Sequence, residues 1–213
     1  MDLSTQLLKM ALVGAEWVLW LLIGLSLVSV AIIVERALFY FGQRGNLRQL
    51  TEEVCELVGR GSTDVARERL ERERHLAARI VAAGLKAVAR GPGAVEQSLA
   101  AAKADARLLL ERNLAVLGTL GSNAPFIGLF GTVIGIIKAF HDLATSQGKG
   151  PSAVMASLSE ALVATAVGLL VAIPAVISYN YFQRRVRTVL MATDAMGHAV
   201  LSELHREGPG RAS

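Results

Sequence analysis

Four polar side chains stand in or at the end of long uncharged segments of the chain. Thr132, Thr165 and Asn180 lie within such segments, and Glu160 is the only carboxylate in the third hydrophobic stretch, at one end of it. A charged group in an apolar segment is costly unless it faces protein or water, so Glu160 is a candidate for function by default. Hydroxyls at Thr132 and Thr165 are the candidate lining of a shared polar face or pore.

The helical positions of these residues leave more than one interpretation open. At about 100° per residue, Asn180 lies only about 60° around a helix from Thr165. Glu160 lies about 7.5 Å along the axis from Thr165 and about 140° around it, so the two need not share one face. Each threonine can instead donate to the carbonyl four residues earlier in its own helix. Glu160 can instead extend its carboxylate outward to the interface.

Three uncharged segments must position these groups. They cover 17–34, 113–137 and 161–183, and 37–41 extends the first. A membrane helix needs about 20 apolar residues. Hydrophobic residues make up 53% of the 213 residues and charged residues 19%, which excludes an ordinary soluble domain. The sequence predicts an all-α, polytopic membrane protein with three transmembrane helices, at 17–41, 113–140 and 153–183.

The distribution of positive charge predicts an orientation. The segment 42–112 holds 13 Lys and Arg residues, and three arginines follow the third span directly. Lys and Arg gather on the cytoplasmic side of membrane proteins. We therefore expect an outer, periplasmic N-terminal segment (1–16, an interfacial helix), a short periplasmic loop (141–152) and a cytoplasmic C-terminus. This orientation explains the net charge of +4 without nucleic-acid binding.

The cytoplasmic segments are also expected to be helical. Good helix formers dominate 63–90 and 94–112, separated by Gly91-Pro92-Gly93. Because no breaker separates 94–112 from the second span, the sequence predicts one helix of about 50 residues there. Beyond the third span, 184–213 is predicted to be a cytoplasmic helix with a disordered end. Two membrane helices would thus extend into a cytoplasmic helical bundle (42–112 with 184–213). The extension of the third span shows an apolar stripe at spacings of three and four, made of Val186, Val189, Thr193, Met196, Val200 and Leu204.

Small residues in the second and third spans predict close helix packing. The second span contains a Gly-xxx-Gly pattern, and the third contains small residues spaced four apart. A proline lies inside each span, where it removes a backbone hydrogen bond and produces either a kink or a hinge. The candidate packing and lumen-shaping residues are Gly128, Gly131, Gly135, Pro125, Ala164, Gly168, Ala172 and Pro174.

Nothing in the sequence favours catalysis or a cofactor. The single cysteine, Cys55, and the four histidines show no metal-ligand spacing, and there is no Ser/His/Asp set or phosphate loop. We expect neither an enzyme nor a bound cofactor. A non-conducting membrane scaffold stays open as the alternative to a channel, although a scaffold has no need for Thr132, Thr165 and Glu160 together.

Two long motifs resemble the MotA/TolQ/ExbB proton-channel family, and most closely its TolQ/ExbB-type subunits. They are Ser122–Ile136 (SNAPFIGLFGTVIGI) and Glu160–Val176 (EALVATAVGLLVAIPAV), the second followed by Tyr179-Asn180. The resemblance implies a bacterial inner-membrane motor subunit driven by the proton-motive force. It also implies a homo-oligomeric ring, five copies in ExbB-like complexes, around two copies of a single-span ExbD/TolR-like partner with an intramembrane Asp. Thr132 and Thr165 match the family's pore threonines, Glu160 its intramembrane glutamate, and Asn180 its polar residue near the inner end.

The sequence does not determine which cellular machine the protein drives. Family members of this type serve envelope constriction (TolQ-like), outer-membrane uptake (ExbB-like) or gliding motility, through a TonB/TolA-like or motility component. The number of copies in the ring, a conducting or structural role for Glu160, and Na⁺ in place of H⁺ are open too. The scarcity of carboxylates in the spans favours H⁺ as the transported ion.

Overall fold

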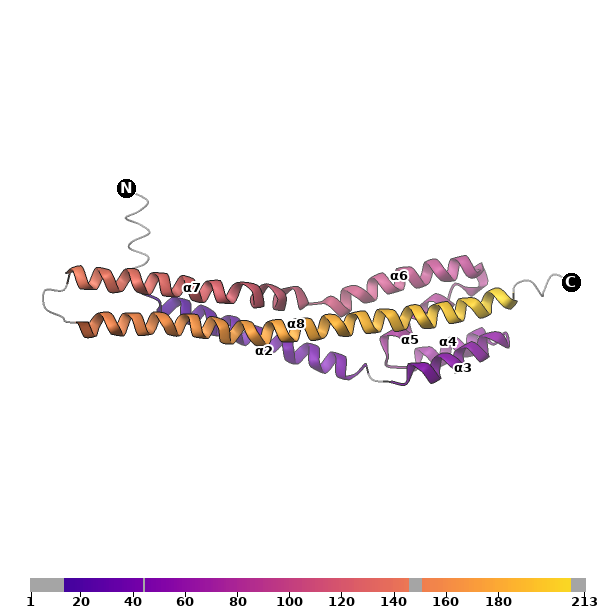
Figure 1. Cartoon of the computed structure of the whole chain (residues 1–213). Helices are drawn as coiled ribbons and strands as arrows, with labels where there is room; N and C mark the ends of the chain where they lie inside the picture. Colours follow the sequence, from indigo (N-terminus) through magenta and orange to yellow (C-terminus); the bar gives the residue numbers. More distant parts are fainter. Residues whose placement is uncertain (1–13, 44, 146–150, 208–213) are drawn as a thin grey trace. The chain divides into compact units, whose positions relative to one another are not determined.

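All regular elements among the described residues are helices, which confirms the all-α prediction. The computed structural model describes residues 14–43, 45–145 and 151–207 (Figure 1). Predictions for the outer N-terminal segment before residue 14, for 146–150 and for the tail after 207 lie outside these residues. In chain order the elements are α2 (Glu16–Phe41), α3 (Leu47–Gly59), α4 (Thr63–Glu71), α5 (Leu76–Leu85), the 3-10 turn η1 (Val88–Arg90), α6 (Pro92–Glu111), α7 (Leu114–Thr145) and α8 (Pro151–Glu207).

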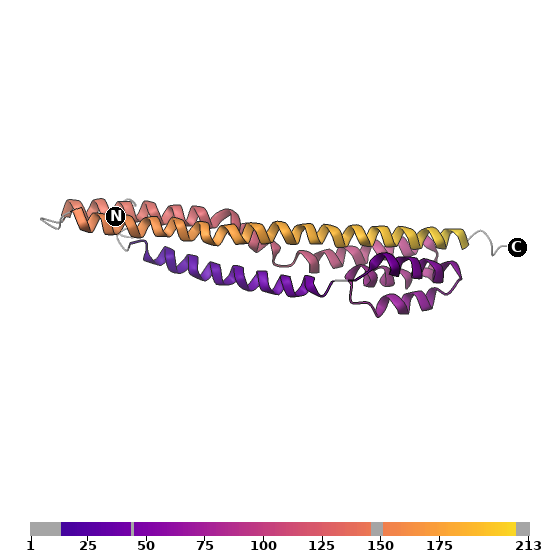
Figure 2. The same ribbon diagram turned by 60° about the horizontal axis from the view of Figure 1, so that its bottom comes forward.

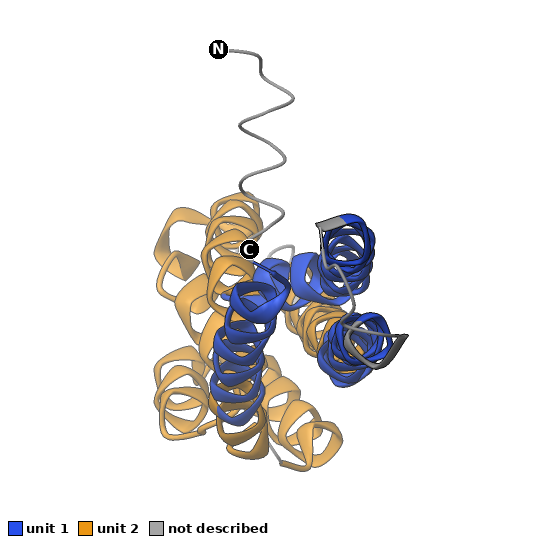
Figure 3. Ribbon diagram, turned by 90° about the vertical axis from the view of Figure 1, so that its left-hand side faces the viewer, with its two compact units in different colours: residues 1–34, 113–180 blue, residues 35–112, 181–213 orange. Residues whose placement is uncertain are grey.

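Three helices are long and apolar enough to cross a membrane, as predicted. They cover Glu16–Phe41, Leu114–Ala144 and Val154–Arg206. The chain divides into two compact units, coloured separately in Figure 3. Unit 1 comprises residues 1–34 and 113–180, and unit 2 comprises 35–112 and 181–213. The helix α8 is unbroken from Pro151 to Glu207 and contributes to both (Figure 2).

Unit 1 is built from α2, α7 and the first part of α8. Its core is small: Val18 and Leu22 of α2 are fully buried against Ala124 of α7 and against Val171 and Ala172 of α8. Many of its other large apolar side chains face outward, as expected for surfaces in contact with lipid or other protein.

Unit 2 is a bundle of α3, α4, α5 and α6 with the last part of α8. Its core contains fully buried side chains such as Val54, Leu70 and Val95. The predicted stripe along α8 is confirmed, because all six of its residues are buried. On the surface of the bundle, Lys103 of α6 binds both carboxylate oxygens of Asp194 of α8, at 2.5 and 2.7 Å.

The prediction of a single helix across 94–140 is wrong, because the helix is interrupted after Glu111. Arg112 is extended (φ −50°, ψ 134°) and Asn113 is left-handed (φ 61°), so α6 ends and α7 begins again at Leu114. Asparagine tolerates the left-handed region better than most residues. Helix α8 continues unbroken into unit 2, as does the end of α2 from Glu35 to Phe41, whereas α7 is separate from α6.

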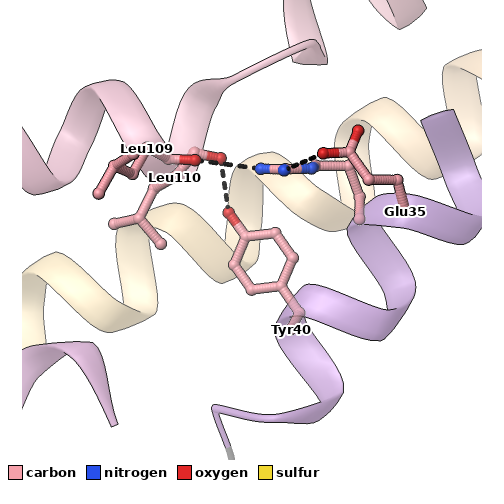
Figure 4. A network of polar contacts seen from close by, with 5 residues as sticks. Glu35, Tyr40, Leu109 and Leu110 are labelled. Carbon is pink, nitrogen blue, oxygen red and sulfur yellow. Dashed lines mark hydrogen bonds and ion pairs between the residues drawn. The ribbon is translucent and has the colours of Figure 1, made fainter. Parts of the chain in front are cut away.

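Two side chains from α2 satisfy carbonyls at the end of α6. The Arg36 guanidinium donates to the carbonyl of Leu109 at 3.0 Å, and the Tyr40 hydroxyl donates to that of Leu110 at 2.9 Å (Figure 4). Arg36 also pairs with Glu35 at 2.7 Å. The last carbonyls of a helix have no partner within it. Arg36 and Tyr40 therefore stabilise the end of α6 at this place.

The segment 63–90, predicted as one helical stretch, divides into α4, α5 and η1. The two helices bury different amounts: α4 buries Ala66 and Leu70, whereas most of α5 is buried. A turn between them lets α5 enter the core. The predicted break at Gly91-Pro92-Gly93 is confirmed, with Gly91 at φ 93° and Pro92 opening α6. The loop predicted at 141–152 is shortened at both ends, since α7 reaches Thr145 and α8 starts at Pro151.

Candidate functional site

The backbones of α7 and α8 meet at two glycines in unit 1. A Cβ atom on Gly128 would lie 2.7 Å from the carbonyl oxygen of Ala164 and 3.2 Å from the Cα of Gly168. A Cβ atom on Gly168 would lie 2.7 Å from the carbonyl oxygen of Ala124. No real Cβ fits at such distances, so this approach requires glycine on both helices.

The close contact extends toward the ends of α7 and α8 that adjoin residues 146–150. A Cβ atom on Gly131 would lie 2.8 Å from the Cβ of Ala164, and one on Gly135 would lie 2.4 Å from the Cβ of Ala161. The same Cβ on Gly131 would lie 3.2 Å from a methyl group of Val18 in α2. Ala164 is fully buried. The glycines of α7 and the small residues of α8 thus form one continuous interface.

The two prolines do not interrupt their helices. Pro125 lies inside α7 and Pro174 inside α8, and each helix is continuous across its proline. Two residues before Pro125, the Asn123 amide donates to the carbonyl of Thr119 at 2.9 Å. Ala172 is buried in the small core of unit 1, whereas Asn180 is exposed at the end of that unit.

The two candidate threonines differ in their hydrogen bonds. Thr132 is buried, and its hydroxyl donates to the carbonyl of Leu129, three residues earlier, at 2.6 Å. A local bond of the expected kind therefore forms, with a register of three rather than four. The hydroxyl of Thr165 is also buried, but it has no hydrogen-bond partner among the described residues. The alternative of a bond to its own helix is therefore wrong for Thr165.

One carboxylate oxygen of Glu160 shares this property with the Thr165 hydroxyl. Its Oε1 atom is buried without a hydrogen-bond partner among the described residues. A buried polar atom left unsatisfied costs about 1–3 kcal/mol, so native proteins rarely keep one without a reason. A carboxylate that simply extended into solvent would not bury an oxygen. The two unsatisfied groups lie five residues apart in α8, within otherwise apolar turns.

The comparison with known proteins assigns the family. Residues 72–195, more than half of the chain, match the MotA/TolQ/ExbB proton channel family. The chain belongs to this family. The match includes both motifs around the glycine interface and every candidate polar residue of unit 1. It also covers α5, α6 and much of the bundle in unit 2.

Individual relatives of this MotA/TolQ/ExbB family member have names from both the ExbB and the TolQ branch. A biopolymer transport protein of Helicobacter pylori named ExbB-like 2 is 44% identical over 98 residues, 46% of this chain and 65% of the relative. The Tol-Pal system protein TolQ of Pseudomonas aeruginosa is 44% identical over 98 residues, 46% and 42% of the two chains. ExbB of Pseudomonas putida is 33% identical over 207 residues, which cover 90% of this chain and 62% of the relative. The chain spans less than two thirds of the length of each relative.

Some contacts of this family member had only a weak signal in the sequence. A Cβ atom on Gly118 would lie 3.2 Å from the ring of Tyr179, and one on Gly121 would lie 2.5 Å from a methyl group of Val176. The sequence shows the two glycines, but it does not show which residues of α8 they contact. The buried Arg36 was not expected either, because an arginine after an apolar span is usually a marker of orientation.

Proposed function

We propose that this chain is a proton-channel and motor subunit, which couples the proton-motive force to mechanical work through a single-span ExbD/TolR-like partner. The observation that supports this most directly is the pair of unsatisfied buried groups on α8, the Thr165 hydroxyl and Glu160 Oε1. Both lack a hydrogen-bond partner among the described residues, and in the proposed complex a rotation of either side chain would expose its oxygen to the partner subunit. The intramembrane Asp of such a partner is a suitable one.

The chemistry of a hydroxyl suits this task. A threonine hydroxyl both donates and accepts, so it can bind a carboxylic acid and a carboxylate equally. In the proposed ring, a pentamer as in ExbB-like complexes, Thr165 and Thr132 would line the lumen around a dimer of the partner. A proton entering from the periplasm neutralises the partner's Asp, and its release to the cytoplasm restores the charge. Each proton contributes about 2.3 kcal/mol per 100 mV of membrane potential.

Location and ion follow from the same proposal. We place the chain in the bacterial inner membrane with its N-terminus periplasmic and its C-terminus cytoplasmic, on the distribution of Lys and Arg. We propose H⁺ as the ion, with no cofactor, no catalytic residue and no nucleic acid involved. A TonB/TolA-like or motility component would receive the mechanical work.

The first experiment identifies the partner. The protein is purified from its native membrane in mild detergent, and co-purifying proteins are identified by mass spectrometry. We expect a small single-span protein with one Asp in its membrane helix. Its periplasmic domain and any further component distinguish uptake, constriction and gliding. A closed ring of this chain alone that conducts no protons in liposomes would favour the scaffold.

The second experiment tests Thr165. The Thr165→Val variant, co-reconstituted with the partner in liposomes, should reduce proton flux about tenfold or more, because valine keeps the shape but not the hydrogen bond. Glu160→Ala should also reduce flux while leaving insertion intact. Thr119→Val is the matched control, since the Thr119 hydroxyl is exposed and bonds its own helix through Ala115 at 2.9 Å. Unchanged flux in Thr165→Val and Glu160→Ala would remove both from the pathway.

A further inference from the structure

A histidine caps the N-terminus of α5, the most buried helix in unit 2. His75 is the N-cap residue of α5, and its side chain is only slightly exposed, at 8%. Its Nδ1 atom accepts a hydrogen bond from the backbone N–H of Ala77 at 3.2 Å. Beside it, Oε1 of Gln43 accepts from the N–H of Leu76 at 2.6 Å. Two side chains thus satisfy amides that the helix itself cannot.

The cap matters because α5 lies at the centre of the bundle. Ala78, Val81 and Ala82 belong to the core of unit 2 and are almost fully buried. Helix α5 contacts both α4 and α6. Gln43 comes from the turn after α2, so its bond also ties the start of α5 to the end of that helix. Loosening the first turn of α5 would therefore affect several helices of the bundle.

The cap requires the neutral form of the histidine ring. Nδ1 can accept a hydrogen bond only while the ring proton is on Nε2; a second proton makes both nitrogens donors. Protonation would therefore break the bond from Ala77 and leave its N–H without a partner in a buried place. It would also put a positive charge at a helix N-terminus, which the helix dipole disfavours.

The groups around His75 do not remove this effect. Glu73 is the nearest carboxylate in sequence, but it is already paired with Arg69, at 2.6 Å, and Arg69 also pairs with Glu53. Burial lowers the pKa of His75, and Glu73 opposes that shift in part. The ring lies on the walls of two small cavities of about 160 and 50 Å³, large enough for water to bring a proton. The charged and titratable residues that line these cavities with it are Tyr40, Glu53, Arg69, Glu73 and Arg185, and the uncharged polar ones are Gln43, Asn46, Gln49 and Thr188.

We propose that His75 is an acid-sensitive switch: its protonation removes the N-cap of α5 and loosens the bundle of unit 2. The switch senses the compartment in contact with unit 2 and is separate from proton transport through unit 1. Above the ordinary pKa of histidine, about 6.5, the ring is neutral and the cap is in place. Because burial lowers the pKa of His75, the folded chain keeps the cap to below that value and loses it as the pH falls through the lowered pKa.

Hydrogen exchange of the full chain in detergent or nanodiscs tests this switch. Protection factors are corrected for the intrinsic effect of pH and followed from about pH 8 to about pH 5.5, on either side of the ordinary histidine pKa. For the first turn of α5, residues 76–79, we expect protection to fall about fivefold or more, the factor that corresponds to a lost N-cap. Peptides from α7, which lies in unit 1, serve as the internal reference.

Three variants make the test specific. Asparagine is a good N-cap that does not titrate, so His75→Asn should keep the protection of α5 across the whole pH range. His198→Asn, on the exposed surface of α8, should respond like the wild type. Gln43→Met leaves His75 as the only cap and should increase the response. A wild-type profile that is flat, or one that His75→Asn reproduces, would overturn the switch.

Discussion

In unit 1 the backbones of α7 and α8 touch at Gly128 and Gly168, whereas in unit 2 the helices are separated by full side chains such as Leu70 and Val54. Leucine and valine cores obtain their stability from apolar area removed from water. Lipid is itself apolar, so packing between membrane helices depends on close contact between small residues instead. The two units thus follow the packing rules of two different solvents.

Their polar groups differ in the same way. In unit 1, Glu160 Oε1 and Thr165 Oγ1 have no hydrogen-bond partner within the described part of the chain. In unit 2 the unsatisfied buried atoms are Nε atoms of Arg36 and Arg67, whose guanidinium groups make other contacts, to Leu109 and to Asp64. The two arginines of unit 2 thus make other contacts through the same guanidinium group, whereas the single hydroxyl of Thr165 in unit 1 makes none among the described residues.

The strongest test of this comparison is a large side chain at the glycine contact. Gly128→Leu would force the backbones of α7 and α8 apart and should destabilise unit 1 by about 4 kcal/mol or more. Unfolding of the full chain by SDS titration measures the loss. Fluorescence of Trp17, whose ring lies 6.1 Å from that of Phe130, reports on unit 1.

Gly24→Leu is the matched control for Gly128→Leu. Gly24 lies in α2, and a Cβ there would meet nothing within 4 Å. This variant should change stability by no more than about 0.5 kcal/mol. Equal stability of the two variants would mean that α7 and α8 can separate without cost, and the contrast between the units would then be lost.

The counterpart in unit 2 is the removal of a large side chain. Leu70 is fully buried in the core, so Leu70→Ala should cost about 3 kcal/mol through lost burial and a cavity. Leu108→Ala is the control, because Leu108 is 74% exposed. Chemical denaturation followed by circular dichroism gives both values. A small loss for Leu70→Ala would show that unit 2 adapts to cavities, unlike a soluble core.

The sequence was sufficient for features that depend on one helix alone. The three spans follow from length and hydrophobicity, and the buried stripe from Val186 to Leu204 follows from its spacing. Features that depend on two distant segments were missed. The end of α6 is bonded by Arg36 and Tyr40, which lie 73 and 70 residues from the carbonyls they bind. Local helix propensity contains no information on such contacts.

The same distinction applies to the candidate site: its residues could be predicted from the sequence, but their contacts could not. Thr132, Thr165 and Glu160 stand out in the sequence because they are polar residues in or beside apolar segments. Whether a threonine bonds its own helix depends on its rotamer and its neighbours, and here Thr132 does so while Thr165 does not. The glycine pattern indicated close packing, but only the structure pairs Gly128 with Gly168 and Gly135 with Ala161.

The smallest expected effect concerns Asn113, where the chain passes from one kind of packing to the other. Asn113→Gly and Asn113→Ala both remove the amide, but only glycine accepts φ 61° without strain, so the alanine variant should be less stable by about 1 kcal/mol. Denaturant titration of the full chain measures the difference. If Asn113→Ala is instead as stable as Asn113→Gly and gains helix by circular dichroism, α6 and α7 have fused, and the conformational preference of Asn113 alone caused the break.

Tyr40→Phe tests whether the hydrogen bond from Tyr40 to the Leu110 carbonyl also stabilises the break. If it does, loss of this bond should increase the gain of helix in Asn113→Ala.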